Sequence, residues 1–244
     1  MNEWITTDLD GTLFSRAHSQ GAIAATWRDS DGAREPSSWI PATRHTLLSR
    51  LAAHFAVVAV TARDLASYSR VHVERLPFNS GAVVANGAIL LRPGDMKPDP
   101  DWDAEIAPQL AAWEEPLTEM AARLEKLSTG RVRSRLVASN TAHPAYLVAK
   151  AEDGFWSTSE GCELRAALSP LGCRIAEIGR ELQVLPPVVS KQIGVAALQN
   201  RYFNGNPPLL AIGDMPEDLG FLAGAVFMAA PADSTLGKRW RNGS

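Results

Sequence analysis

Near the start of the chain, the segment Ile5-Thr6-Thr7-Asp8-Leu9-Asp10-Gly11-Thr12 combines a strand signal with a pair of acidic residues. Residues 4–7 are apolar or β-branched, which predicts a short strand that ends at the first aspartate. The Asp-Gly pair predicts a tight turn, and a plain turn after a strand is the alternative interpretation. Two carboxylates in a loop of this kind suit phosphoryl transfer. We expect Asp8 to attack phosphorus, and Asp10 to protonate the leaving oxygen and then activate water.

Outward from this segment, apolar runs alternate with helical stretches. Residues 42–53 have apolar positions three and four apart, as in an amphipathic helix. Residues 55–60 form a continuous apolar run, typical of a strand buried on both faces. Asp64 is expected to N-cap a helix that reaches about Leu76, and residues 82–85 to form another strand. The alternation returns in a helix over 191–200, a strand over 208–212, a short helix over 219–223 and a strand over 225–228. This order predicts an open, mostly parallel α/β sheet.

The middle of the chain has a different order of elements. A helical pattern over residues 103–127 is expected to break at Pro108 and Pro116. It is followed by two strands, a helix and two more strands, over 131–138, 145–151, 158–168, 173–178 and 181–185. Their hairpin-length connections imply antiparallel pairing. We therefore expect a core α/β domain over residues 1–91 and 186–244, with an α+β cap domain of αββαββ order inserted over 92–185.

Three further segments place polar residues where predicted strands end or helices begin, the edge at which open α/β sheets bind ligands. Thr61 can bond a phosphoryl oxygen or simply cap the next helix, and Arg63 can add positive charge. Lys191, at a helix start, opposes the helix dipole and needs an anionic partner unless it is a solvated surface lysine. Asp214 and Asp218 are ligands of the kind that Mg²⁺ prefers. The ion is expected because an aspartate nucleophile and a phosphate repel each other.

In this order, the four segments resemble the motifs of the haloacid dehalogenase (HAD) superfamily of aspartate-nucleophile phosphatases. The first motif is matched by Asp8, Asp10, Gly11 and Thr12, the second by Thr61, the third by Lys191, and the fourth by Asp214 and Asp218. The resemblance implies a Rossmann-like core in which Mg²⁺ is held by Asp8, the main-chain carbonyl of Asp10, Asp214 and Asp218. It implies that Thr61 and Lys191 hold the phosphoryl group, with substrate contacts from Thr12, Ala62, Arg63 and Asn86.

The insertion resembles the type two cap of the Cof-type and sucrose-phosphatase-like branch. Thr61-Ala62-Arg63 and Asn86-Gly87-Ala88 also resemble segments of that branch. Ala62 stands where that branch has glycine, Gln192 where glycine often follows the lysine, and Glu217 where asparagine precedes the last aspartate. None of these changes removes a catalytic group, but together they leave the substrate open.

Two segments outside the motifs bear on the substrate. Arg131, Arg133 and Arg135 are expected to share one face of the first cap strand, because side chains alternate along a strand. A basic face turned toward the site suits a second anionic or polyhydroxyl group, with Arg133 as its expected contact, whereas a solvated outer face is the alternative. Residues 15–41 form a longer connection than a strand–helix link needs, and are either a flap over the site or a disordered surface loop.

Composition narrows the remaining functions. A net charge of −3 does not favour binding to nucleic acid or to anionic membranes. The first residues lack the basic and apolar regions of a signal peptide, and the two cysteines do not form a metal-binding or disulfide pattern. We therefore expect a cytoplasmic hydrolase, monomeric or homodimeric, of a small phosphomonoester such as a sugar, polyol or glycerate phosphate. A phosphomutase on the same scaffold and a phospho-acceptor signalling module are the alternatives.

Overall fold

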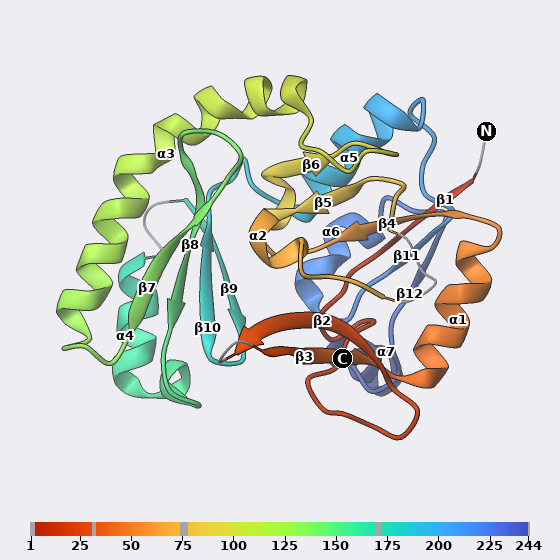
Figure 1. The fold of residues 1–244 in the computed structure, drawn as a ribbon. Coiled ribbons are helices and arrows are strands. Elements are labelled where there is room, and N and C mark those ends of the chain that lie inside the picture. The colour runs from red at the N-terminus through yellow and green to blue at the C-terminus, as the bar shows by residue number, and fades with distance from the viewer. Residues whose placement is uncertain (1–2, 31–32, 74–77, 169–171, 244) are drawn as a thin grey trace. The chain divides into compact units, whose positions relative to one another are not determined.

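The computed structural model describes residues 3–30, 33–73, 78–168 and 172–243. The chain divides into two compact units (Figure 1), which we call the core unit (Met1–Asp99 with Lys191–Ser244) and the cap unit (Pro100–Ser190). The chain therefore crosses between the units twice, at Asp99–Pro100 and at Ser190–Lys191. These crossings lie a few residues beyond the boundaries predicted at 91/92 and 185/186. No helix among the described residues is long and apolar enough to cross a membrane.

The core unit is built on a six-stranded sheet, as predicted. Across the sheet the strands are β12 (Phe227–Ala229), β11 (Leu210–Ile212), β1 (Trp4–Thr7), β4 (Ala56–Val60), β5 (Ala82–Val84) and β6 (Ile89–Leu91). The first five are parallel to one another, and only the edge strand β6 is antiparallel. Every residue of β1 is buried, in keeping with a central strand covered on both faces. Because parallel strands end at the same edge, the residues that follow β1, β4 and β11 are brought together.

Helix α5 (Lys191–Tyr202) contacts both places where the chain crosses between the units. It begins at the first residue after the cap unit, and its last residue, Tyr202, donates a hydrogen bond of 2.7 Å to Oδ2 of Asp99, the last residue before the cap unit. A Cβ atom on Gly194 would lie 2.5 Å from Cγ1 of Val83 and 2.7 Å from Cα of Gly87. Only glycine lets α5 approach the sheet this closely, so the helix is held firmly against β5 and the turn that follows it.

The other helices of the core unit are α1 (Ala42–Ala52), α2 (Leu65–Tyr68), α6 (Leu219–Leu222) and α7 (Thr235–Asn242). Asp64 does N-cap α2, by accepting a 2.7 Å hydrogen bond from the Ser67 N–H. The predicted extension of this helix to Leu76 is wrong, since α2 ends at Tyr68. After Tyr68 the chain turns and pairs with the strand that contains Ala25. In this pairing the His72 N–H donates to the Ala25 carbonyl at 2.9 Å. Residues 74–76 of the predicted helix lie outside the described residues.

The connection over residues 15–41 is an antiparallel hairpin of β2 (Ile23–Ser30) and β3 (Ala33–Ile40). The hypothesis of a disordered loop is therefore wrong, while its role as a flap over the site stays a prediction. Register shifts between Ala24 and Trp27 interrupt the pairing. Such bulges break the alternation of buried and exposed residues by which a strand is recognised from sequence, which explains why the hairpin was not predicted.

The cap unit has the predicted αββαββ order. Its elements are α3 (Pro100–Leu127), β7 (Arg133–Ala138), β8 (Pro144–Lys150), α4 (Ser159–Leu168), β9 (Arg174–Ile178) and β10 (Glu181–Leu185). The strands form an antiparallel sheet in the order β7-β8-β10-β9. The sheet and the two helices share a hydrophobic core that includes Leu124, Leu147, Trp156, Leu164 and Leu182. This is the α+β insertion expected from the sequence.

Helix α3 runs without interruption through Pro108 and Pro116, so the predicted break is wrong. Each proline lacks the N–H that would bond the carbonyl four residues earlier, on Ala104 and Ala112. Both alanines are exposed, so water can bond the freed carbonyl groups. Burial of the apolar side of the helix, including Leu117, then outweighs the cost of the prolines.

Candidate active site

Asp8 stands at the carboxyl end of β1, where its backbone N–H donates to the Ile212 carbonyl of β11 at 2.8 Å. The loop that follows is closed by hydrogen bonds from the N–H groups of Leu13 and Phe14 to the Leu9 carbonyl. Gly11 has a φ of +91°, and a Cβ atom there would lie 2.2 Å from Oδ2 of Asp214. Glycine is therefore required at this position both by the backbone conformation and by the approach of the second carboxylate.

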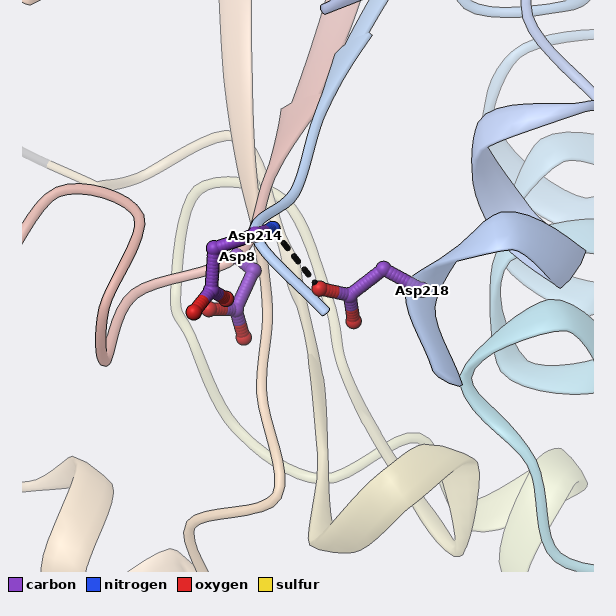
Figure 2. A group of neighbouring side chains, drawn as sticks. All are labelled: Asp8, Asp214 and Asp218. Atoms are coloured by element: carbon purple, nitrogen blue, oxygen red, sulfur yellow. Dashed lines mark hydrogen bonds between the residues drawn. The ribbon is translucent and has the colours of Figure 1, made fainter. Parts of the chain in front are cut away.

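Three carboxylates and one ammonium group meet at this edge of the sheet. Asp8, Asp214 and Asp218 each offer an oxygen atom within 4.8 Å of the others (Figure 2). Lys191 Nζ donates to Oδ1 of Asp8 and to Oδ1 of Asp218, both at 2.7 Å. Lys191 is therefore not a solvated surface lysine. It orients the Asp8 carboxylate from the start of α5.

Asp218 also shapes the loop after β11. Its Oδ2 accepts hydrogen bonds from the backbone N–H groups of Asp214 at 3.0 Å and Met215 at 3.1 Å, the first of which is drawn in Figure 2. Thr12 Oγ1 donates to Oδ1 of Asp214 at 3.1 Å, which links the loop after β1 to the loop after β11. The two carboxylates of the fourth motif thus have different environments. Asp218 is tied to protein groups through both oxygens, whereas Asp214 faces Asp8.

Burial and crowding raise the pKa values of two of these carboxyl groups. Burial raises the pKa of Asp8 to about 7, with Lys191 opposing the shift and Asp218 and Asp214 adding to it. Burial and the charge of Asp218 raise the pKa of Asp214 to about 6. For Lys191, burial alone would lower the pKa, but the carboxylates of Asp8 and Asp218 outweigh it and raise the pKa above its ordinary value.

A divalent cation fits this arrangement of groups. Three carboxylates against one ammonium leave an excess of negative charge when all are ionised, and this repulsion adds to burial in raising the pKa values of Asp8 and Asp214. Carboxylate oxygens are the ligands that Mg²⁺ prefers, together with water and phosphate. Among the described residues, these three are the acidic group that meets the spacing for a metal ion. The predicted contribution of the Asp10 carbonyl stays a prediction.

The Asp10 side chain lies outside the triad. Its two oxygens accept hydrogen bonds from Nε and Nη2 of Arg63, each at 2.6 Å, in a bidentate ion pair. The Arg63 guanidinium also lies over the Phe14 ring, 5.9 Å from its centroid. The structure therefore brings together two residues with separate predicted roles, the acid/base residue and a substrate-binding arginine.

The second motif and the turn after β5 are joined through their backbones. Thr61 Oγ1 accepts a hydrogen bond of 3.2 Å from the Arg63 N–H, but Asp64 and not Thr61 caps α2, so the alternative interpretation of a capping threonine is wrong. The Asn86 N–H donates to the Thr61 carbonyl at 3.1 Å, and Asn86 is buried in the left-handed conformation with φ of 53°. Ala62 lies between Thr61 and Arg63. The roles of Thr61, Ala62 and Asn86 toward a substrate stay predictions.

Arg133 is in the cap unit, on β7, and its neighbour in the sheet is Lys150 of β8. Both are exposed. Arg131 does not share this face, contrary to the prediction. It precedes β7, forms a 2.6 Å ion pair with Glu160, and lies over the ring of Phe155, which belongs to the hydrophobic core of the cap unit. The expected basic row is therefore shorter, with Arg133 and Arg135 on the strand itself.

Arg44, on α1, reaches the loop after β1, a contact that was not predicted. Its Nη1 donates to the Gly11 carbonyl at 2.9 Å, and its Nη2 lies 3.2 Å from Oδ1 of Asp233. No motif or pattern in the sequence distinguishes Arg44 from the other basic residues of an amphipathic helix.

The sequence matches no family model and no curated protein. Its structure, however, is similar to those of several solved phosphatases. A HAD subclass IIB sugar phosphatase is 15% identical, with 99% of each chain covered and a TM-score of 0.56. The sucrose-phosphatase of Synechocystis, solved with sucrose and phosphate, is 14% identical, with 99% of this chain and 97% of that chain covered and a TM-score of 0.51. The C-terminal domain of trehalose-6-phosphate phosphatase from C. albicans is also 14% identical, with 99% and 76% covered and a TM-score of 0.56.

At these identities the similarity concerns the fold. The likeness spans nearly the whole of this chain, including the inserted cap unit. The chain therefore has the fold of the HAD superfamily phosphatases, with a cap of the kind found in subclass II.

Proposed function

We propose that this protein is a Mg²⁺-dependent phosphatase that hydrolyses a small phosphomonoester through a phosphorylated Asp8. The observation that carries the proposal is the position of Asp8. It is buried at the carboxyl edge of a parallel sheet, held by Lys191 and adjacent to two further carboxylates. The shared fold with HAD phosphatases supports the same reaction class.

Each step of the reaction is assigned to a residue of this site. A carboxylate oxygen of Asp8 attacks phosphorus, and the bond from phosphorus to the leaving oxygen breaks as Asp10 gives that oxygen a proton. Asp10 then takes a proton from water, which attacks phosphorus and releases phosphate and free Asp8. Lys191 orients Asp8 throughout and, with Thr61, holds the phosphoryl oxygens. A bound Mg²⁺ supplies the positive charge that lets a carboxylate approach a phosphate.

The proposed substrate class is a sugar phosphate or a related polyol or glycerate phosphate. The sugar phosphatase, sucrose-phosphatase and trehalose-6-phosphate phosphatase that share the fold support this class. The exposed pair of Arg133 and Lys150 on the cap sheet supports a substrate with a second polar or anionic group. A cytoplasmic location and a monomeric or homodimeric state stay predictions.

Phosphate release from p-nitrophenyl phosphate and from a panel of phosphorylated sugars and polyols, with and without Mg²⁺, tests the proposal. Asp8→Asn is expected to abolish turnover, because an amide is not a nucleophile toward phosphorus and the substitution keeps the side-chain shape. Asp153→Asn is the matched control, since this side chain in the cap unit is 85% exposed. Activity that survives Asp8→Asn refutes the assigned nucleophile.

The same panel separates the two alternatives. A phosphomutase would convert a sugar phosphate into an isomer without releasing phosphate. A phospho-acceptor module would retain a phosphoryl group after treatment with acetyl phosphate, for seconds to hours, and would show no turnover. The position of Asp10 in the same loop as Asp8 favours hydrolysis, provided that Asp10 exchanges its ion pair with Arg63 for the leaving oxygen and water during turnover.

A further inference from the structure

Arg44 is part of no motif, but it holds the loop that carries the nucleophile. It lies in the first turn of α1, and its side chain is 22% exposed. One nitrogen, Nη1, donates to the Gly11 carbonyl at 2.9 Å, and the other, Nη2, lies 3.2 and 3.3 Å from the carboxylate oxygens of Asp233. Asp233 is 78% exposed, and an ion pair with so exposed a partner contributes little by itself. The contact with Gly11 is therefore the informative one.

These contacts belong to a ring of hydrogen bonds that joins the loop after β1 to the loop after β11. From Gly11 the chain leads to Thr12, whose hydroxyl donates to Oδ1 of Asp214 at 3.1 Å. The Asp214 carbonyl accepts a 2.9 Å hydrogen bond from the Leu236 N–H at the start of α7. Asp233, just before that helix, returns the ring to Arg44. The loop after β1 and the loop after β11 are thus fixed to each other by contacts that do not involve Lys191.

We propose that Arg44 is a positioning residue for phosphoryl transfer, which sets the separation of the Asp8 and Asp214 carboxylates by fixing the Gly11 carbonyl. The Gly11 N–H is bonded within the loop, to the Phe14 carbonyl at 3.0 Å, whereas the Gly11 carbonyl is held from outside the loop, by Arg44. Because the peptide bond is planar, a fixed Gly11 carbonyl also fixes the orientation of the Thr12 N–H and the start of the Thr12 side chain. A guanidinium can bond two partners at once in a fixed geometry, which an ammonium group does less well. Arginine therefore suits this position better than lysine.

The inference rests on the proposed function, and four variants test it. Arg44→Ala is expected to lower kcat by about 10- to 100-fold, since a displacement of about 1 Å can cost that much, while KM changes little. Arg44→Lys keeps the charge and is expected to recover part of the loss. Asp233→Ala opens the ring at its exposed end but keeps the Gly11 contact, and is expected to lower kcat by less than Arg44→Ala does. Arg50→Ala, which removes the same charge from the exposed end of α1, is the matched control and is expected to change kcat by less than about twofold.

A second readout does not depend on turnover. The dissociation constant of Mn²⁺, measured by electron paramagnetic resonance, is expected to rise in Arg44→Ala and not in Arg50→Ala, because only the first variant frees the two carboxylates to move apart. Thermal unfolding of each variant shows whether it is folded. If Arg44→Ala does not fold, Arg44→Lys decides the question through the same two measurements.

Native kcat and native Mn²⁺ affinity in a folded Arg44→Ala, or in Arg44→Lys where the alanine variant does not fold, overturn the proposal. So does an equal loss in Arg50→Ala, which would point to overall charge rather than to the Gly11 contact. A native protein without phosphatase activity refutes the proposed function instead. The Mn²⁺ comparison then still tests whether Arg44 sets the geometry of the carboxylates.

Discussion

Binding of Mg²⁺ is expected to weaken steeply as the pH falls from 7.5 to 5.5. The pKa of Asp8 is raised to about 7 and that of Asp214 to about 6, mainly by burial. In the metal-free protein both carboxyl groups are therefore mostly ionised at pH 7.5 and mostly protonated at pH 5.5. Because Mg²⁺ binds the ionised form, the proton and the cation compete for the same oxygens.

The two pKa values fix the size of the effect. Treated as independent, protonation of Asp8 weakens binding about 25-fold between pH 7.5 and 5.5 and protonation of Asp214 about fourfold, together about 100-fold or ~2.7 kcal/mol. The sign for stability follows from the same shifts. A carboxyl group whose pKa is raised by folding stabilises the fold most below its unfolded value of 3.8, and this contribution is lost as the pH rises through the folded value. The proton competes with Mg²⁺ at low pH, so the stabilisation that bound Mg²⁺ adds should be larger at pH 7.5 than at pH 5.5.

Isothermal titration calorimetry of Mg²⁺ at pH 5.5, 6.5 and 7.5, at constant ionic strength, measures the effect. In Asp8→Asn the dependence should fall to about the fourfold contribution of Asp214, because an amide does not bind the competing proton. A dissociation constant in the native protein that changes by less than about threefold over this range would refute the electrostatic reasoning.

Three further variants have expected outcomes. Gly11→Ala should lower the free energy of unfolding by about 1–3 kcal/mol and abolish phosphatase activity, because its Cβ would meet Asp214. Gly94→Ala, with a similar φ of +90° and no atom within 4 Å of the new Cβ, is the control, and urea denaturation compares the two. Lys191→Met should destabilise the metal-free protein at pH 7.5 by about 3–5 kcal/mol, since it leaves Asp8 and Asp218 without their partner; a native midpoint of unfolding would contradict this. Arg133→Ala should raise KM for the true substrate and not for p-nitrophenyl phosphate, with Lys126→Ala as the control. An unchanged KM for the true substrate would show that Arg133 does not contact it.

Continuous apolar runs made the core sheet predictable from sequence. Residues 56–60 and 210–212 are apolar runs of the kind typical of a buried parallel strand, and both form strands where expected. Local signals failed where contacts distant in sequence compete with them. The helix after Asp64 stops because residues 71 and 72 pair with β2, and α3 passes two prolines because its apolar side is buried. Neither contact can be inferred from a window of a few residues.

In the candidate site, too, some residues could be predicted from local sequence and others depend on contacts distant in sequence. Asp8, Asp214, Asp218 and Lys191 were predicted together, because each lies just after a predicted strand or at a predicted helix start, in the order of a known set of motifs. In the structure they lie within reach of one another. The pairing of Asp10 with Arg63 was not predicted, although both were candidates. Arg44 carries no sequence signal, because a basic residue on an exposed helix face is common and only the structure shows that it bonds the Gly11 carbonyl.

Helix α5 acts as a spacer between the two places where the chain enters and leaves the inserted unit. Its first residue follows one crossing directly, and its last residue bonds the residue before the other. Twelve residues at 1.5 Å each make the helix about 18 Å long. A different domain grafted in place of residues 100–190 would therefore need one terminus at the start of this helix and the other within reach of the Tyr202 side chain at its end. A donor whose ends are much closer together would pull on Lys191 itself, so a cap exchange is limited less by the fold of the new cap than by the distance between its ends.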